Sequence, residues 1–98
     1  MDYKISSKAQ TDLIGIWEYT FDNWSVEQAD RYLKIIIERI GEICLKPDIG
    51  KNYAFLRNGY WGVNIKSHII FYRIQDDNII EVIRILHQRM DFQNRLGD

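Results

Sequence analysis

The sequence predicts an α+β fold, in which an N-terminal helical hairpin packs on one face of an antiparallel sheet of three to five strands. Two segments with apolar residues at helical spacing come first, and a very short connection joins them. From residue 53 onward, apolar and polar residues alternate as they do in strands. Near the C-terminus, the eight residues 79–86 have the composition of a buried strand and lead into a polar tail.

The composition indicates one domain spanning residues 1–98 with one modest core, because 46% of the residues are hydrophobic. Thirteen basic and fourteen acidic residues give a net charge of −1, which argues against whole-surface attraction to nucleic acid but permits a local basic patch. No apolar stretch approaches the roughly 20 residues that span a bilayer, and residues 1–5 lack the features of a signal peptide. We therefore expect a cytoplasmic protein without membrane contact.

Neither a metal nor a cofactor is predicted. Cys44 is the single cysteine, which excludes an intramolecular disulfide and a cysteine-based metal site. His68 and His87 are the two histidines, and neither lies in a recognised metal-ligand pattern.

The first helix is expected to begin at a capping box formed by Ser7 and Gln10, after a short edge strand at residues 3–5. It ends near Asn23. Its apolar stripe consists of Ala9, Leu13, Ile16, Trp17, Thr20, Phe21 and Trp24.

A second capping box, formed by Ser25 and Gln28, starts the next helix at once. That helix ends before Pro47, because proline disfavours helical geometry at the preceding residue. Its apolar stripe consists of Val26, Ala29, Leu33, Ile36, Ile37, Ile40 and Cys44. Two capped helices with so short a connection form an antiparallel hairpin.

A meander of three or four strands follows the hairpin. Residues 53–57 are expected to form its first strand, which ends in a two-residue turn at Asn58-Gly59. The next strands occupy residues 60–66, 69–74 and 79–86, with a tight connection around Ser67-His68.

The polar tail and the strands before it contain the candidates for chemistry. Arg84, His87, Arg89 and Asp91 offer an imidazole near neutral pKa and guanidinium groups that bind phosphate, yet the same groups can simply terminate the last strand. We favour this structural interpretation. Lys66, Arg73 and Arg84 lie on consecutive predicted segments and form a basic patch only if the unknown strand registers bring them together.

Three apolar residues lie off the stripes of their helices. Tyr19 is far from the first stripe, Ile35 sits on the charged face of the second helix, and Leu45 is also off-stripe. They mark a surface that a partner could cover.

The order and spacing of several segments resemble a known family. Residues 3–19 read Tyr-x-Ile-Ser-x-x-Ala-x-x-Asp-Leu-x-x-Ile-Trp-x-Tyr, residues 46–50 read Lys-Pro-Asp-Ile-Gly, residues 68–73 read His-Ile-Ile-Phe-Tyr-Arg, and residues 82–91 read Val-Ile-Arg-Ile-Leu-His-Gln-Arg-Met-Asp. Together they resemble the ParE branch of the RelE/ParE toxin superfamily over nearly the whole chain.

This resemblance implies the toxin of a bacterial type II toxin–antitoxin pair, with no cofactor and no catalytic residues. ParE-like toxins poison DNA gyrase by stabilising its cleaved-DNA state. A ParD-like antitoxin holds them inactive by wrapping its C-terminal region around the toxin, and its N-terminal domain binds operator DNA. The candidates for target binding are then Arg84, His87, Arg89, Met90 and Asp91, and those for antitoxin binding are Tyr19, Ile35 and Leu45.

Two alternatives remain open at the level of sequence. A RelE-like toxin cleaves messenger RNA on the ribosome, and the residues available for that chemistry are Lys66, Arg73, Arg84 and His87. The slightly acidic net charge and the Leu86-His87 ending favour the gyrase-directed branch instead. The other alternative is a non-toxic protein that only represses transcription together with its antitoxin.

Overall fold

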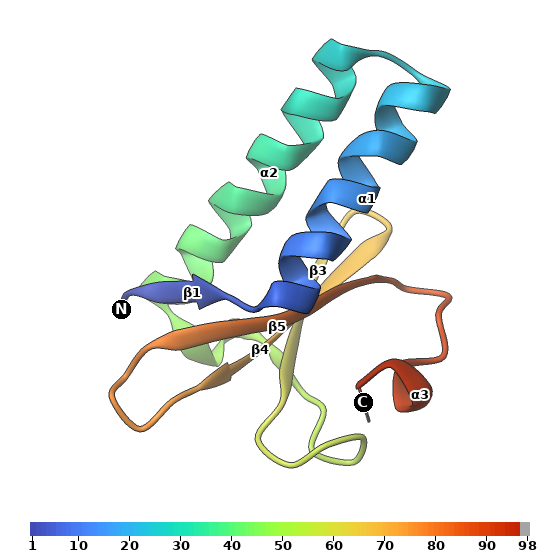
Figure 1. Cartoon of the computed structure of the whole chain (residues 1–98). Coiled ribbons are helices and arrows are strands. Elements are labelled where there is room, and N and C mark those ends of the chain that lie inside the picture. Colours follow the sequence, from blue (N-terminus) through green and yellow to red (C-terminus); the bar gives the residue numbers. More distant parts are fainter. Residues whose placement is uncertain (97–98) are drawn as a thin grey trace.

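The computed structural model describes residues 1–96 and places two long antiparallel helices on one face of a five-stranded sheet (Figure 1). The elements in chain order are β1 (Tyr3–Ile5), α1 (Ser7–Asn23), α2 (Val26–Leu45), the short 3-10 helix η1 (Pro47–Ile49), β2 (Lys51–Asn52), β3 (Trp61–Ile65), β4 (His68–Ile74), β5 (Ile80–His87) and α3 (Phe92–Leu96). The strand order is β1-β5-β4-β3-β2, and only the β1–β5 pair is parallel. The predicted α+β class is confirmed. No described helix has the length and apolar character that a membrane span requires.

Helix α1 begins one residue earlier than predicted. Ser6, rather than Ser7, is its N-cap: the Ser6 Oγ accepts a hydrogen bond from the Ala9 backbone N–H at 3.1 Å. The same hydroxyl donates to Ile83 O at 2.8 Å, and the Ser6 N–H donates to Val82 O at 3.0 Å. The contact of Ser6 with β5 therefore determines which of the two adjacent serines caps α1. The Ser25 cap of α2 is confirmed, since its Oγ accepts from the Gln28 N–H at 3.1 Å.

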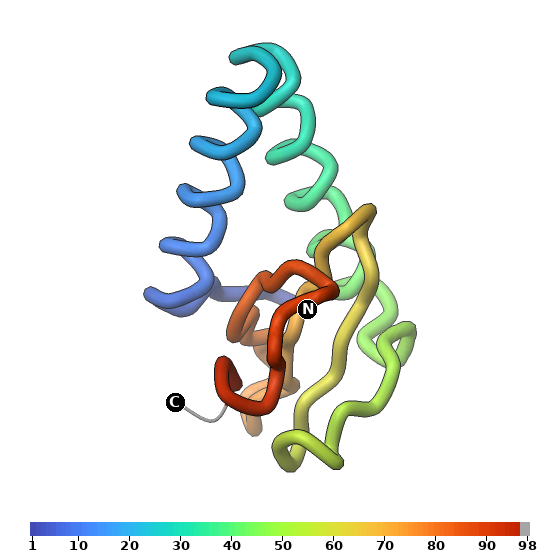
Figure 2. Tube along the Cα trace, turned by 90° about the vertical axis from the view of Figure 1, so that its right-hand side faces the viewer, coloured from blue at the N-terminus to red at the C-terminus, as the bar shows by residue number. Residues whose placement is uncertain are grey.

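The hairpin packs on the sheet at its base, while its tip stands away from the sheet (Figures 1 and 2). Ala9, Ile36, Ile40 and Ile43 are fully buried near the base. Trp24, at the tip, is 67% exposed although it belongs to the predicted stripe. The tip therefore presents apolar side chains that no part of the described chain covers.

Strand β5 contains a bulge that changes which side chains face the helices. The pairing runs from Phe71↔Arg84 to Tyr72↔Val82, which leaves Ile83 as the extra residue. Ile85, rather than Arg84, consequently joins Val82 in the core under the helices. Strict alternation along the strand would have placed Arg84 in that core.

The predicted strand at residues 53–57 is wrong. These residues form turns, and β2 is confined to Lys51–Asn52. The turn predicted at Asn58-Gly59 is present, since the Tyr60 N–H donates to Arg57 O at 3.2 Å, but its type differs, because Gly59 alone of the two central residues has a positive φ, of 82°. The loop instead folds over the sheet and packs Tyr53 against Phe71. A Cβ atom at Gly62 would lie 2.7 Å from the Tyr53 ring, so a glycine is needed for this approach.

The sheet face opposite the hairpin is covered as well. Residues from that loop, from β4 and β5 and from the unpredicted helix α3 form a second apolar cluster there, which consists of Tyr53, Tyr60, Ile69, Phe71, Leu86 and Leu96. The sheet therefore has an apolar layer on both faces, whereas the sequence predicted helices on one face only.

Tyr72 of β4 connects the segment after α2 to the sheet through its hydroxyl group. Its hydroxyl donates to Pro47 O at 2.5 Å and accepts from the Gly50 N–H at 3.2 Å. A Cβ atom at Gly50 would lie 2.5 Å from this hydroxyl, so glycine is required for the close contact. Burial raises the pKa of Tyr72 and keeps its hydroxyl protonated as a donor.

Candidate functional site

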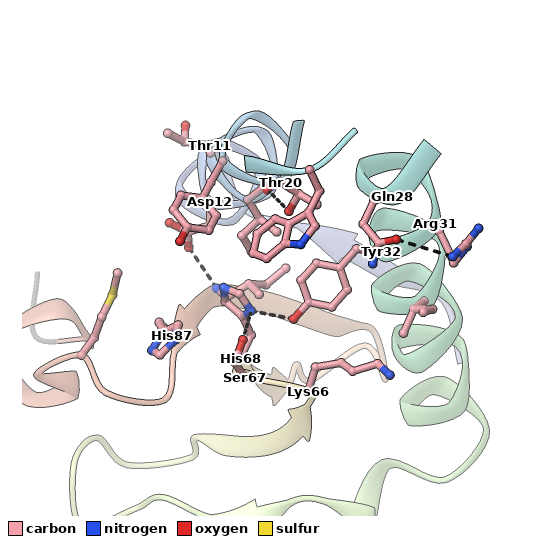
Figure 3. Close-up of a pocket in the computed structure, with 17 residues that line it drawn as sticks. Thr11, Asp12, Thr20, Gln28, Arg31, Tyr32, Lys66, Ser67, His68 and His87 are labelled. Carbon is pink, nitrogen blue, oxygen red and sulfur yellow. Dashed lines mark hydrogen bonds between the residues drawn. The ribbon is translucent and has the colours of Figure 1, made fainter. Parts of the chain in front are cut away.

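A cleft of about 980 Å³ lies between the hairpin and one end of the sheet (Figure 3). Its walls are α1 and the first half of α2, and its floor comes from the β3–β4 turn and the end of β5. The cleft exists because the helices diverge from the sheet toward the hairpin tip. It has an apolar part near the tip and a polar end near the sheet.

The apolar part contains two of the residues predicted to bind a partner. Tyr19 from α1 and Ile35 from α2 both line it, together with Trp24. Tyr19 is 63% exposed, and its ring centroid lies 6.2 Å from that of Trp24. Leu45, the third predicted residue, lies at the far end of α2, is 87% exposed and does not line the cleft. The structure thus brings two of the three together.

The polar end is organised by a hydrogen bond between Tyr32 and His68, drawn in Figure 3. The Tyr32 hydroxyl lies 2.7 Å from His68 Nδ1 and 3.3 Å from Ile65 O. A carbonyl oxygen can only accept, so both contacts are satisfied when Tyr32 donates to Ile65 O and accepts from His68 Nδ1, which also lies 3.4 Å from Ser67 Oγ. Nε2 of His68 then keeps its lone pair. Burial lowers the pKa of His68, the nearby His87 lowers it further, and Asp12 opposes both effects.

His87 lies beside His68 with the ring centroids 5.4 Å apart and the rings nearly perpendicular. Its Nδ1 accepts a hydrogen bond from the Arg89 N–H at 3.2 Å, so the neutral ring carries its hydrogen on Nε2. The Met90 N–H donates to His87 O, and the Gln88 N–H donates to Ser67 O, both at 2.9 Å. These bonds fix the turn after β5 against the cleft.

An ion pair between Asp12 and Arg84 joins α1 to β5 next to the cleft. Arg84 donates to Asp12 from Nε at 2.8 Å and from Nη2 at 2.9 Å, and each side chain is 13% exposed. The Ile85 N–H donates to the same carboxylate at 2.9 Å. Strand β1 pairs only with residues 80–82 of β5. Beyond them, the Asp12 carboxylate accepts the hydrogen bond of the Ile85 N–H at the same edge of the sheet.

The basic residues considered for RNA cleavage do not gather into one patch. Lys66 is exposed in the β3–β4 turn at the rim of the cleft, with a positive φ of 54°. Arg73 lies five residues beyond His68 on β4, about 17 Å along the strand, where its Nε donates to Glu81 at 2.6 Å. Arg84 is held by Asp12. Of the four candidates, only Lys66 and His87 line the cleft.

The remaining tail candidates lie in the turn that follows β5. Arg89, Met90 and Asp91 are exposed, and of these Met90 lines the cleft. The Asp91 carboxylate accepts a hydrogen bond from Asn94 Nδ2 at 2.7 Å at the start of α3. The tail thus closes the fold and also forms an exposed surface beside the cleft.

Several residues of the site were not singled out from the sequence. Tyr32 and His68 meet only because α2 lies across the β3–β4 turn, and no local pattern indicates that contact. Asp12 belongs to a recognisable segment, but its partner Arg84 is 72 positions away. In residues 1–96 no three histidine, cysteine or acidic side chains form a cluster that could hold a metal. Burial raises the pKa of the Cys44 thiol, which disfavours the thiolate.

Known proteins match nearly the whole length of this chain. The family described as the ParE toxin of the type II toxin–antitoxin system parDE matches residues 3–92. Toxin ParE1 of Mycobacterium tuberculosis is 39% identical over 94 residues, which cover 96% of both chains. Toxin ParE1 of Caulobacter vibrioides is 38% identical over 95 residues, or 97% of both. Toxin ParE of Escherichia coli is 28% identical over 96 residues, or 98% of this chain and 93% of that one.

Two solved structures share the fold. One is described as the chromosomal ParDE toxin–antitoxin system from P. aeruginosa, with a TM-score of 0.78 and coverage of 89% of this chain and 95% of that chain. The other is the toxin–antitoxin complex RelBE2 from Mycobacterium tuberculosis, with a TM-score of 0.68 and coverage of 89% and 96%. Both are 19% identical to this chain, so they bear on its fold alone.

Proposed function

This chain belongs to the ParE toxin family of type II toxin–antitoxin systems, and we propose that it poisons DNA gyrase by stabilising the cleaved-DNA complex of that enzyme. The observation that carries the proposal is the family match, which extends from β1 to the start of α3 and includes the tail. In this proposal the toxin acts by binding and performs no chemical step of its own.

The arrangement of the basic residues supports an inhibitor over a nuclease. A nuclease that acts without metal needs several cations at one phosphate to stabilise the developing charge. Arg73 and Arg84 are instead held in ion pairs with Glu81 and Asp12, at different places on the sheet. Neither arginine lines the cleft that contains Lys66 and His87.

We propose that the turn after β5 contacts gyrase. His87, Arg89, Met90 and Asp91 lie in this turn or at its start, and all but half-buried His87 are exposed. Arg84 contributes to this surface indirectly, because its Nη1 donates to Arg95 O at 3.3 Å and so positions α3.

We further propose that a ParD-like antitoxin neutralises the toxin by filling the cleft. The apolar side chains of Tyr19 and Ile35 supply the contact there, as exposed apolar surface on a small protein commonly does. An antitoxin that wraps the toxin also reaches Leu45 at the other end of α2. Operator DNA is contacted only through the antitoxin.

One observation favours a second candidate, a ribosome-dependent messenger RNA nuclease. Tyr32, Lys66, His68 and His87 all line one cleft and include groups that can transfer protons. The third candidate, a non-toxic co-repressor, shares the fold and the antitoxin contact but lacks an effect on growth.

Expression of the toxin without antitoxin distinguishes the three candidates. We expect growth arrest with DNA-damage signalling and filamentous cells. Cleaved messenger RNA without DNA damage would establish the nuclease, and normal growth at verified toxin levels would leave the co-repressor. His87→Ala refines the result, because a nuclease that uses this imidazole as acid or base loses about 10²–10⁴-fold in rate.

The antitoxin contact is tested by charge substitution in the cleft. Ile35→Glu and Tyr19→Glu are expected to weaken antitoxin binding without unfolding the toxin, because both side chains are at least partly accessible. Ile14→Glu is the matched control, since Ile14 is exposed on α1 outside the cleft. Leu45→Glu reports whether the antitoxin extends along α2. Unchanged affinity in both cleft variants would remove the cleft from the interface.

A further inference from the structure

The polar end of the cleft is cationic although the whole chain carries a net charge of −1. Among the described residues that line the cleft, Asp12 is the single acidic one, and Arg84 and the Ile85 N–H already engage its carboxylate. Arg31 and Lys66 lie on the rim. A ligand that fills the whole cleft must therefore be apolar on one side and anionic at the sheet end.

The two imidazoles at this end use their ring nitrogens differently. His68 directs Nδ1 at Tyr32, and its Nε2 can accept a proton without disturbing that bond. His87 uses Nδ1 to accept from the Arg89 N–H, so protonation there would break the bond that holds the turn. Within residues 1–96, the structure gives neither Nε2 a hydrogen-bond partner. Nε2 of His68 is thus the position that can gain a proton, and Nε2 of His87 can donate a hydrogen bond.

We infer that the His68–His87 end of the cleft is a carboxylate-recognition subsite, where an acidic side chain of the bound antitoxin segment receives hydrogen bonds from both Nε2 atoms and binding places a proton on His68. The inference rests on the proposed function, because the occupant is the antitoxin. An amphipathic protein segment fits the cleft, since its apolar face meets Tyr19 and Ile35 and its acidic edge meets the imidazoles and Lys66.

The direction of the pH dependence follows from the surroundings of His68. The charged and titratable groups around it are Asp12 from α1, Tyr32 from α2, Lys66 from the β3–β4 turn and His87 from β5, and Arg84 of β5 pairs with that Asp12. In the free toxin, burial and His87 lower the pKa of His68, so the imidazole is neutral at pH 7. An added carboxylate raises that pKa, the complex binds more protons than its parts, and affinity rises as pH falls from 7.5 to 6.

Calorimetry of the toxin with the antitoxin encoded by the neighbouring reading frame measures this proton directly. Titrations at pH 6.5 in two buffers of different ionisation enthalpy give the number of protons taken up on binding. Wild-type toxin is expected to take up about half a proton or more. His68→Asn, which retains a donor for Tyr32, is expected to abolish that uptake. His87→Gln, which retains a donor near Nε2, should keep the uptake and bind at most about tenfold more weakly.

The outcomes separate this inference from the proposed function. Tight binding without proton uptake, or uptake unchanged in His68→Asn, overturns the subsite and leaves the antitoxin proposal intact. Failure of the antitoxin to bind overturns both, whereas a gyrase assay without inhibition leaves the subsite untouched. Replacing each acidic residue of the antitoxin segment by its amide should identify one that removes the uptake. Binding of single-stranded RNA with the same dependence on His68 would reassign the subsite to phosphate.

Discussion

Replacing Asp12 by alanine is expected to destabilise the toxin strongly, although Asp12 lies on a surface-facing helix. Its carboxylate accepts three hydrogen bonds, two from Arg84 and one from the Ile85 N–H, at 2.8–2.9 Å. The side chains of Asp12 and Arg84 are each 13% exposed, which places the pair closer to a buried ion pair than to a surface pair. Removal of one partner of a buried pair costs about 3–5 kcal/mol, against about 0–1 kcal/mol at the surface.

We expect Asp12→Ala to lower the free energy of unfolding by about 3 kcal/mol, because the charge partner and the acceptor for Ile85 are lost together. For a domain of this size, that loss corresponds to a fall in Tm of roughly 12–24 °C. Urea unfolding followed by tryptophan fluorescence measures it, with an unchanged m value as evidence that the same cooperative unit unfolds.

Two control variants separate the contributions. Asp12→Asn keeps an acceptor for the Ile85 N–H and should lose about half as much stability. Arg73→Ala removes an ion pair whose arginine side chain is 49% exposed, and should lose less than about 1 kcal/mol. A loss in Asp12→Ala no larger than that in Arg73→Ala would refute the assignment of Asp12 as the connection between α1 and β5.

Three further predictions concern stability. Tyr72→Phe removes bonds to Pro47 and Gly50 and should cost about 1–3 kcal/mol in urea unfolding, whereas Tyr3→Phe on the exposed edge strand should cost nothing measurable. Ser6→Ala should cost about 1–2 kcal/mol and Ser7→Ala less than about 0.5 kcal/mol, since only Ser6 caps α1; the reverse order would restore the cap inferred from the sequence. Because the pKa of His68 is lowered in the folded state, the unfolded chain binds more protons than the folded chain as pH falls below 6.5. The free energy of unfolding should therefore decrease as pH falls from 7.5 to 5.5. That decrease should be smaller in His68→Asn; equal slopes in the two proteins would remove His68 as its source.

The helical half of the fold is predictable because its signals are local. The cap at Ser25, the apolar spacing and the limit set by Pro47 each act within a few residues; the cap and the limit agree with the structure, and the spacing predicts both helices although Trp24 of its stripe is exposed. The prediction of Ser7 as the cap of α1 is wrong because a hydrogen bond from Ser6 to β5 selects Ser6 instead. The sequence does not predict the bulge at Ile83 or the loop at residues 53–57 for a similar reason, since each depends on packing between segments that are distant in the chain.

The candidate site is predictable only in part. Tyr19 and Ile35 stand out because each breaks the apolar pattern of its helix, and both line the cleft. The role of Arg84 cannot be read from its neighbours, because it depends on a carboxylate 72 positions away. The His68–Tyr32 contact likewise requires the crossing of α2 over the sheet, which no spacing in the sequence specifies.

The central claim, that this ParE-family toxin acts on DNA gyrase, is tested most directly with purified components. Toxin, gyrase, supercoiled plasmid and ATP are incubated, and the reaction is stopped with detergent and protease so that trapped breaks appear as linear DNA. We predict linear plasmid that increases with toxin concentration, requires gyrase and disappears when the antitoxin is added first. Unchanged supercoiling and no linear DNA at saturating, correctly folded toxin would contradict the claim.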